Sequence, residues 1–294
     1  MNNLSDEGIE GMIPDRIGRP RFLGFQLGET IPDRNTIWLF REKLTKAGAF
    51  GKLFEDYEKQ LRAKGYEPRK GQIADATVVS APRQRMTDEE KARAKKGESA
   101  AEIWPDKPEK ARRKDVDARR PMKSVGMRKI DRAGKFGEGG GGLLREMKRG
   151  YENHVSIDRK WRFVRRWSAT SAARHDGHEL GNLLDMDNGC KTVRADSAQL
   201  SAENEAMLED RGFKSRIHRK KPRGKPMPRR ASGANAKRSK MRACVEHVFA
   251  QQKGPMDFSI RSVGLARAEG RIATANICYN MRRAVFLGRR LAAG

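Results

Sequence analysis

The sequence predicts an α/β fold, that is, a sheet with helices packed on it. Short runs of β-branched or alternating apolar residues predict strands at 73–79, 155–157, 161–167 and 193–196. Longer segments in which apolar residues recur at helical spacing predict helices before, between and after these strands. This order along the chain is the one expected of an α/β sheet with helices packed on it.

The composition predicts a folded protein with a polyanionic partner. The chain has 294 residues, enough for one large domain or two smaller ones. It carries 64 Lys and Arg against 38 Asp and Glu, a formal net charge of +26. A folded protein tolerates this self-repulsion best when it binds a polyanion, so nucleic acid is the first candidate. An anionic membrane is the second, but no window approaches the roughly 18 apolar residues of a spanning helix.

The N-terminal sequence and the cysteines favour a cytoplasmic location. Residues 1–15 carry acids where a signal peptide would carry a basic region and an apolar run. Cys190, Cys244 and Cys278 lie far apart and form no CxxC pair. We therefore expect neither a disulfide framework nor a zinc knuckle, and we predict that the thiols are small buried side chains in a reducing compartment.

Residues 1–68 are predicted to form an N-terminal helical segment, followed by a catalytic domain at 69–294. Residues 1–20 are polar and suggest no firm element. Apolar spacing between 37 and 61 predicts two helices joined near Gly48, with Asp33 or Asn35 as the first N-cap. Such a unit usually packs against the rest of the fold or positions DNA.

The predicted strand at 73–79 contains an acid in an apolar run. Asp75 interrupts Ile73 to Val79, and a buried carboxylate is costly unless it is paired or binds a cation. The alternative is that Asp75 faces solvent at the edge of the sheet.

Residues 86–150 are predicted to be a charged insertion, partly helical and partly flexible. A glycine run at 137–142 resembles a phosphate loop, but no strand precedes it and no GKT or GKS follows. A linker is the better interpretation.

After the insertion, residues 155–167 are predicted to form a β-hairpin. Val155 and Ile157 alternate with polar residues, the residues after them form a turn, and a return strand spans 161–167. A helix is expected at 179–184. His175 and His178 could hold a metal, but with no third nitrogen or thiol nearby a structural role is the better interpretation.

A strand at 193–196 ends in Asp196, and a helix from Ser201 to Glu209 begins with Ser201 as N-cap. A further short strand is expected at 214–221. Residues 211–242 contain 14 Lys and Arg, no acid and three prolines, which predicts a loop that sits on phosphates. A helix spanning 272–281 is expected to close the fold.

Residues 237–253 are predicted to form a helix with charges at the edge of its apolar stripe. Met241, Val245 and Val248 lie in the stripe, while Arg242, Glu246 and Lys253 lie together on its flank. A salt-bridged surface helix is the ordinary explanation of an Arg to Glu spacing of four.

Three carboxylates are thus expected at one rim of the sheet, namely Asp75, Asp196 and Glu246. Phosphodiester cleavage and transfer need such acids to hold two divalent ions, and hard oxygen ligands favour Mg²⁺ or Mn²⁺. Asp75 would bridge both ions, and each of the others would complete one. Seven cationic side chains are predicted to bind DNA. Two of them, Arg242 and Lys253, are predicted to contact the phosphate that undergoes reaction. The seven residues are Arg242, Lys253, Arg219, Lys220, Lys221, Lys237 and Arg238.

Several segments, in order, resemble the DDE transposases of bacterial insertion sequences, in the group called IS Five of the IS Four-like superfamily. They are IADATVVSAPRQR, YENHVSIDRKW, SAARHDG, ADSA, SAENEAMLEDRGF, SRIHRKKPRGKPMP and KRSKMRACVEHVFAQQK. The superfamily signature places Tyr, Arg, Glu and Lys at spacings of three, four and seven. Arg242, Glu246 and Lys253 match it, while Ser239 replaces the Tyr.

The resemblance implies a ribonuclease-H-like fold, with a mixed sheet flanked by helices. It implies that the protein excises an insertion sequence and transfers its strands. It also implies double-stranded DNA with terminal inverted repeats as the partner, and we expect a homodimer acting on the bacterial nucleoid.

The sequence departs from the family at three places besides Ser239. The N-terminal helical region is shorter than usual, residues 121–148 do not follow the family pattern, and an aromatic is missing near Gln199. A second hypothesis is therefore a truncated or degenerate copy that binds DNA or a partner transposase without catalysis. A third, a basic RNA-binding protein, is disfavoured because no aromatic lies between Lys214 and Arg242.

Overall fold

The structure is a computed structural model that describes residues 3–26, 28–119, 149–222, 224 and 226–292. The chain divides into two compact units. The first, here the helical unit, comprises Met1–Glu67, Glu246–Ser259 and Gly270–Gly294. The second, here the sheet unit, comprises Pro68–Val245 and Ile260–Glu269.

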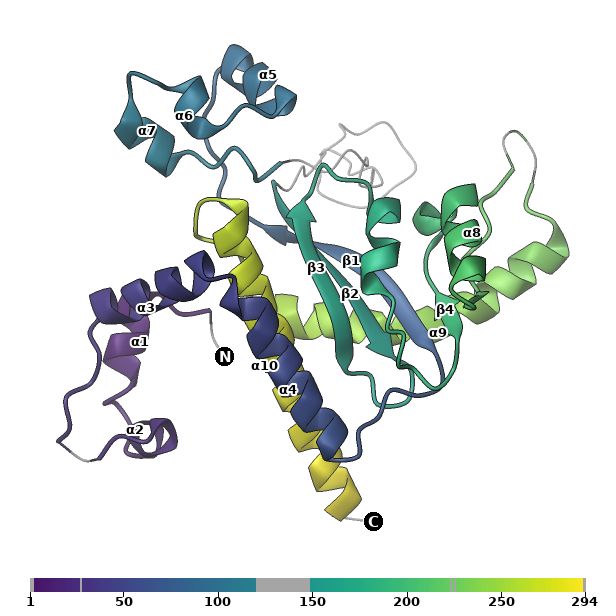
Figure 1. Cartoon of the computed structure of the whole chain (residues 1–294), viewed down its shortest axis with the longest axis horizontal. Helices are drawn as coiled ribbons and strands as arrows, with labels where there is room; N and C mark the ends of the chain where they lie inside the picture. Colours follow the sequence, from purple (N-terminus) through teal and green to yellow (C-terminus); the bar gives the residue numbers. More distant parts are fainter. Residues whose placement is uncertain (1–2, 27, 120–148, 223, 225, 293–294) are drawn as a thin grey trace, which may run out of the picture. The chain divides into compact units, whose positions relative to one another are not determined.

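The sheet unit contains a five-stranded mixed sheet, seen face-on in Figure 1. Its strands are β1 (Gln72–Ser80), β2 (Gly150–Asp158), β3 (Val164–Ser171), β4 (Thr192–Arg194) and β5 (Lys214–Ser215), in the order β3-β2-β1-β4-β5. β2 runs antiparallel to both β1 and β3, whereas β4 runs parallel to β1 and β5 parallel to β4. This mixed order confirms the predicted ribonuclease-H-like α/β fold.

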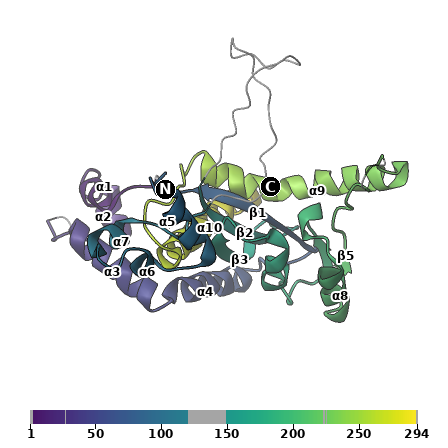
Figure 2. The same ribbon diagram turned by 90° about the horizontal axis from the view of Figure 1, so that it is seen from above.

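Helical segments cover both faces of this sheet. The 3₁₀ helix η1 (Asp176–Leu183) packs against β2 and β3, and α8 (Ala202–Asp210) packs against η1 and β5. Together they enclose apolar side chains such as Leu180, Val193 and Leu208. The first part of α9 (Arg229–Lys253) runs along the opposite face (Figure 2).

Three predicted elements of this unit differ from the structure. The segment expected as an α-helix at 179–184 is the 3₁₀ helix η1, and the strand expected at 214–221 has only two residues, β5. The basic segment 211–242 was predicted to be a loop, but α9 begins at Arg229. Ala, Arg and Lys are good helix formers, and a helix from 229 satisfies backbone groups that a loop would leave to water.

The part of the charged insertion that the structure describes before residue 120 contains three short helices. They are α5 (Asp88–Lys96), α6 (Ala100–Ile103) and α7 (Pro108–Arg113), the first two with capping boxes at Thr87 and Ser99. Their apolar contact centres on Trp104, whose Nε1 donates to Glu90 at 2.7 Å. The predicted linker with the glycine run at 137–142 lies outside the described residues.

The helical unit contains the N-terminal helices, which are α1 (Asp6–Met12), α2 (Gly18–Leu23), α3 (Arg34–Lys46) and α4 (Ala49–Ala63). Of the two predicted N-caps, Asp33 caps α3 by accepting from Thr36 N at 2.8 Å. The two helices are joined at Gly48, as predicted, and Gly48 adopts a left-handed conformation. Residues 1–20, for which the sequence suggested no element, contain α1 and the start of α2.

Two long helices complete this unit. The last part of α9 is joined to α10 (Leu265–Ala292) by a buried hydrogen bond from Gln252 Nε2 to Asn276 Oδ1, at 2.8 Å. Ile272 and Tyr279 of α10 are buried, as the helical spacing near 272–281 indicated.

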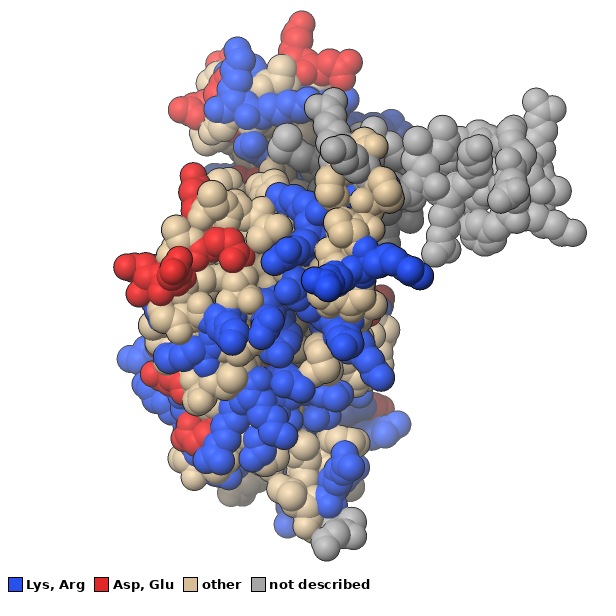
Figure 3. Space-filling view, turned by 90° about the vertical axis from the view of Figure 1, so that its right-hand side faces the viewer, with Lys and Arg blue, Asp and Glu red and all other residues tan. Residues whose placement is uncertain are grey.

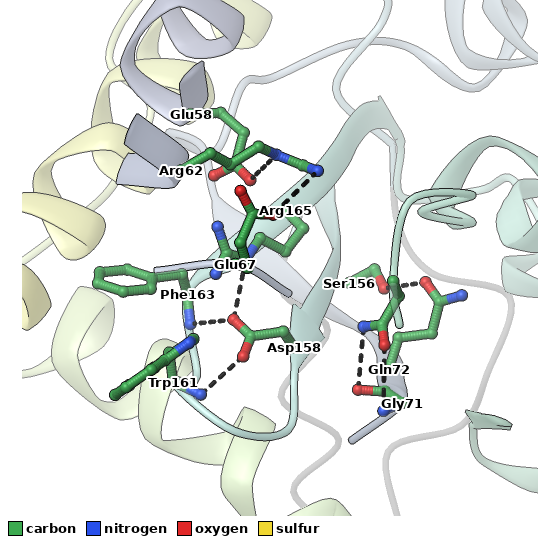
Figure 4. Close-up of polar contacts among 11 residues, drawn as sticks. Glu58, Arg62, Glu67, Gly71, Gln72, Ser156, Asp158, Trp161, Phe163 and Arg165 are labelled. Atoms are coloured by element: carbon green, nitrogen blue, oxygen red, sulfur yellow. Dashed lines mark hydrogen bonds and ion pairs between the residues drawn. The ribbon is translucent and has the colours of Figure 1, made fainter. Parts of the chain in front are cut away.

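A buried ion pair closes the β2–β3 hairpin (Figure 4). The Asp158 carboxylate accepts from Trp161 N at 2.6 Å, from Phe163 N at 3.2 Å and from Arg165 Nε at 2.9 Å. Neither charged side chain is more than 1% exposed. The turn is therefore held by a carboxylate that depends on Arg165 for its counter-charge.

The start of β1 is held by a second polar network, part of which, at Gly71, Gln72 and Ser156, is drawn in Figure 4. Gln72 Oε1 accepts from Asp185 N at 2.9 Å and from Ser156 Oγ at 3.2 Å. The Asn188 side chain accepts from Gly71 N and donates to Gly71 O, at 3.2 and 3.3 Å. A Cβ at position 71 would lie 2.7 Å from Thr192 O, so only glycine lets β1 approach β4 so closely.

The prediction that the three thiols are buried is wrong, because Cys190, Cys244 and Cys278 are only partly buried. In the described part of the chain, no helix combines the length and the apolar character needed to cross a bilayer.

Replacing Arg165 with Met is expected to destabilise the sheet unit by about 3 kcal/mol, because it leaves the buried Asp158 carboxylate without its counter-charge. The midpoint of urea unfolding, followed by circular dichroism, measures this loss. Arg112→Met is the control, since Arg112 is 77% exposed in its pair with Glu109 and should change the midpoint little. Equal effects of the two substitutions would contradict the prediction.

Candidate active site

The central strand of the sheet carries the first acid. Asp75 lies in β1, opposite Val155 of β2, and its Oδ1 accepts from Ala76 N at 3.0 Å. The side chain is only 15% exposed. Because β1 is hydrogen-bonded to β2 on one side and to β4 on the other, Asp75 does not lie on an edge strand. The alternative of a solvent-facing acid at the sheet edge is therefore wrong.

The second acid follows the neighbouring parallel strand. Ile73 of β1 is paired with Arg194 of β4, so Asp75 and Asp196 each lie two residues beyond a paired position. Because the two strands run in the same direction, this register brings both acids to the same level of the sheet. Asp196 follows β4 rather than ending it, and its Oδ1 caps the 3₁₀ helix Ser197–Gln199 by accepting from Ala198 N at 2.7 Å.

An arginine from α9 contacts both carboxylates. Arg242 Nη1 lies 3.4 Å from Asp75 Oδ2 and 3.7 Å from Asp196 Oδ2. One guanidinium thus supplies the positive charge between two acids that would otherwise repel each other. The structure brings these three predicted site residues together.

The environment of Asp75 favours its protonated form. Burial raises the pKa of its carboxyl to about 6, and the carboxylates of Asp196 and Asp176 add to the rise. Arg242 and the hydrogen bond from Ala76 N act in the opposite direction. The effect of burial is the larger one, so the pKa of Asp75 stays raised. A cation bound beside this buried carboxylate would therefore stabilise its charged form more than it would stabilise an exposed carboxylate.

Two predicted site residues lie further along α9, in the helical unit. Glu246 is four residues beyond Arg242, about one helical turn, and Lys253 is the last residue of the helix. Both side chains are exposed. Their position beside Asp75 and Asp196 stays a prediction.

The predicted DNA-binding cations of the sheet unit surround the start of α9. Arg219, Lys220, Lys221 and Lys237 are exposed, and Arg238 donates to Ile217 O at 2.6 Å. Lys and Arg side chains gather over the face of the molecule shown in Figure 3. Sequence reasoning missed Arg194 and Arg216, which line a cavity together with Lys237 and Arg238. Alternation in β4 could have indicated Arg194, because it lies two residues before Asp196.

A second group of possible metal ligands was also missed. Glu152, His154 and Asp176 are buried, and one ligand atom from each lies within 4.8 Å of the others. Their two-residue spacing on β2 puts Glu152 and His154 on one face of the strand, which is a signal the sequence did contain. Of the predicted pair, His175 accepts from Gly177 N through Nδ1, which supports its structural role.

Two family models match the chain. The model described as "Transposase DDE domain" matches residues 66–281, and the model described as "Transposase domain" matches residues 1–43. The first match includes β1, β4 and the whole of α9. No solved structure matches the chain.

Replacing Asp75 with Asn is expected to stabilise the metal-free protein above about pH 6. Folding raises the pKa of Asp75 from 3.8 to about 6, so wild-type stability falls as the pH rises through this range. At higher pH the penalty, up to about 3 kcal/mol, is fully present, and the amide removes it.

Urea midpoints measured with a chelator at several pH values test this expectation. The gain of Asp75→Asn should be largest above pH 6 and should vanish near pH 4. Asp106→Asn, at an exposed position, is the matched control. A gain that is absent, or equal at all pH values, would contradict the assignment of a buried, destabilised carboxylate.

Proposed function

The chain belongs to the family of DDE transposases, and from that premise we propose that it cleaves DNA at the ends of an insertion sequence and transfers the strands to a target. The observation that carries the proposal is the parallel register of β1 and β4, which brings Asp75 and Asp196 to one place beside Arg242. Membership of the IS Five group rests on the segments quoted from the sequence.

The donor set fits a pair of Mg²⁺ or Mn²⁺ ions. Asp75 and Asp196 offer hard carboxylate oxygens, and both already lie within ion-pair distance of one cationic group. We propose Glu246 as the third ligand, because a spacing of four puts it on the same side of α9 as Arg242. When bound, such ions activate the attacking oxygen and stabilise the leaving oxygen of a phosphodiester.

The cations have separate roles in this proposal. Arg242 neutralises the two aspartates in the metal-free protein and would contact nonbridging phosphate oxygens when DNA is bound, as would Lys253. Arg219, Lys220, Lys221, Lys237 and Arg238 would hold the backbone of double-stranded DNA carrying the terminal inverted repeats. The acting form would be a homodimer on the bacterial nucleoid.

One observation favours the alternative of a degenerate copy that binds DNA or a partner transposase without catalysis. Ser239 takes the place of the signature Tyr, and His218 lies 2.9 Å from its hydroxyl. A serine cannot supply the phenol and the stacking surface that a tyrosine offers to DNA. The two functions differ in whether metal-dependent cleavage occurs.

Removal of any one of the three acids is expected to abolish strand transfer. Asp75→Asn, Asp196→Asn and Glu246→Gln should each lower the rate by roughly 10³-fold or more, since metal ions supply several kcal/mol of charge stabilisation. The assay uses a duplex ending in the inverted repeat that flanks the coding sequence, with Mg²⁺ or Mn²⁺.

Glu209→Gln is the matched control, because Glu209 is an exposed acid on α8 and should leave the rate unchanged. DNA affinity measured with a chelator should survive in all three acid variants. Wild-type binding without cleavage would overturn the catalytic proposal and support the degenerate copy.

DNA affinity is expected to fall steeply with salt. Each neutralised phosphate should contribute a slope of roughly 0.9 in log affinity against log salt. Fluorescence anisotropy at several salt concentrations measures the slope, and Lys220→Met or Lys221→Met should each reduce it by about one. Binding that does not depend on salt would contradict a role for the basic segment.

A further inference from the structure

Four cations line one cavity of the sheet unit. The cavity, about 230 Å³ in volume, is lined by Arg194, Arg216, Ala234, Lys237, Arg238 and Met241. No acid is among these lining residues. The cations come from three elements, since Arg194 belongs to β4, Arg216 follows β5 and the others lie on α9. Only the tertiary structure brings them together.

The walls of the cavity are fixed by contacts with the main chain. Arg238 Nη1 donates to Ile217 O at 2.6 Å, which holds α9 against the end of β5. Ser239, the next residue, lies 2.9 Å from His218 Nε2, and the His218 ring also contacts Ala195 O through Nδ1. The cations of the cavity therefore lie on a part of the structure that hydrogen bonds hold in place, and not on an unsupported loop.

The cations of this cavity are held in an unfavourable environment. Burial lowers the pKa of Arg194, and the neighbouring Arg159, Arg216 and Arg238 lower it further. Burial also lowers the pKa of Arg238, with Arg216 and Arg219 adding to the effect. A guanidinium stays charged in proteins, so the repulsion persists until an anion enters.

Arg194 also has hydrogen-bonding capacity left over. Its Nη1 atom is buried and has no hydrogen-bond partner among the described residues. A buried donor without an acceptor is costly, which adds to the unfavourable environment of the Arg194 cation.

The cavity lies next to the candidate active site along two elements. Arg194 is two residues before Asp196, and Arg238 is four residues before Arg242 on α9. Four helical residues span roughly 6 Å. Phosphates of one DNA strand advance about 3.4 Å per nucleotide along the duplex axis, so the two sites lie no more than about two nucleotides apart.

We propose that the cavity binds one backbone phosphate of the DNA strand, within about two nucleotides of the phosphate held at Arg242. The lining offers four cations and no acid, which matches the negative charge and the several acceptor oxygens of a phosphate. This inference rests on the proposed DNA substrate. Its effect is to set the register in which the strand crosses Asp75 and Asp196.

Single methylphosphonate substitutions along the strand test the proposal, because each removes the charge of one phosphate. The duplex carries the inverted repeat that flanks the coding sequence, and affinity is measured with a chelator so that no cleavage is required. For the wild type, one substitution should weaken binding roughly tenfold at the cavity phosphate and another at the Arg242 phosphate.

Arg194→Met and Arg216→Met should each weaken binding of the unmodified duplex, and the cavity methylphosphonate should then cause little further loss. The Arg242 phosphate should keep its effect in both variants, and Arg242→Met should show the reverse pattern. Lys240→Met is the control, since Lys240 is exposed on α9 and does not line the cavity. Thermal melting confirms that each variant is folded.

The proposal is supported if Arg194→Met and Arg216→Met both remove the effect of a methylphosphonate at one phosphate, and if that phosphate lies near the Arg242 phosphate. This dependence is called coupling below. Additive losses at every position, or coupling to a phosphate far from that of Arg242, would overturn the proposal, and so would the absence of DNA binding. Loss of strand transfer with the coupling intact would overturn only the catalytic function.

Discussion

The candidate active site depends on two carboxylates, Asp75 and Asp196, being held close together just beyond the point where β1 and β4 pair. Their mutual repulsion and the burial of Asp75 both oppose this arrangement. Two features offset the cost. The parallel register of Ile73 with Arg194 fixes the backbone, and Arg242 provides a positive charge within 4 Å of each acid. A metal ion would take over a role that a guanidinium fills in its absence.

Buried polar groups set that register. Gly71 lets the backbone of β1 approach Thr192, and Asn188 and Gln72 satisfy the groups on either side of this contact. On the other side of β1, the β2–β3 hairpin is closed by Asp158 and Arg165. Buried charges stabilise little on balance, but they disfavour any alternative pairing that would leave them unsatisfied. The acids are thus positioned by groups that take no part in the chemistry.

Hydrogen bonds also hold in place part of the positive charge of the chain. Its excess of +26 is concentrated in part at the start of α9 and around β4 and β5, next to the acids. Among the cations that repel one another there, Arg238 donates a hydrogen bond to Ile217 O, and the adjacent Ser239 contacts His218. A surface built in this way is prepared for an anionic strand before the strand arrives, which lowers the cost of ordering side chains on binding.

The sequence alone determined the class of the fold, most of its elements and the chemistry of its polar residues. Alternating and helical periodicities are local, so β1, the hairpin, α3, α4 and the helix carrying Arg242 were predictable, as was the cost of an acid at Asp75. The place of the helix start at Arg229, the 3₁₀ form of η1 and the shortness of β5 were decided by tertiary packing, which overrides local pattern. The joining of Arg194 and Arg216 with α9, and of Glu152 and His154 with Asp176, also needed the structure, because a linear sequence carries no distances between residues far apart along it.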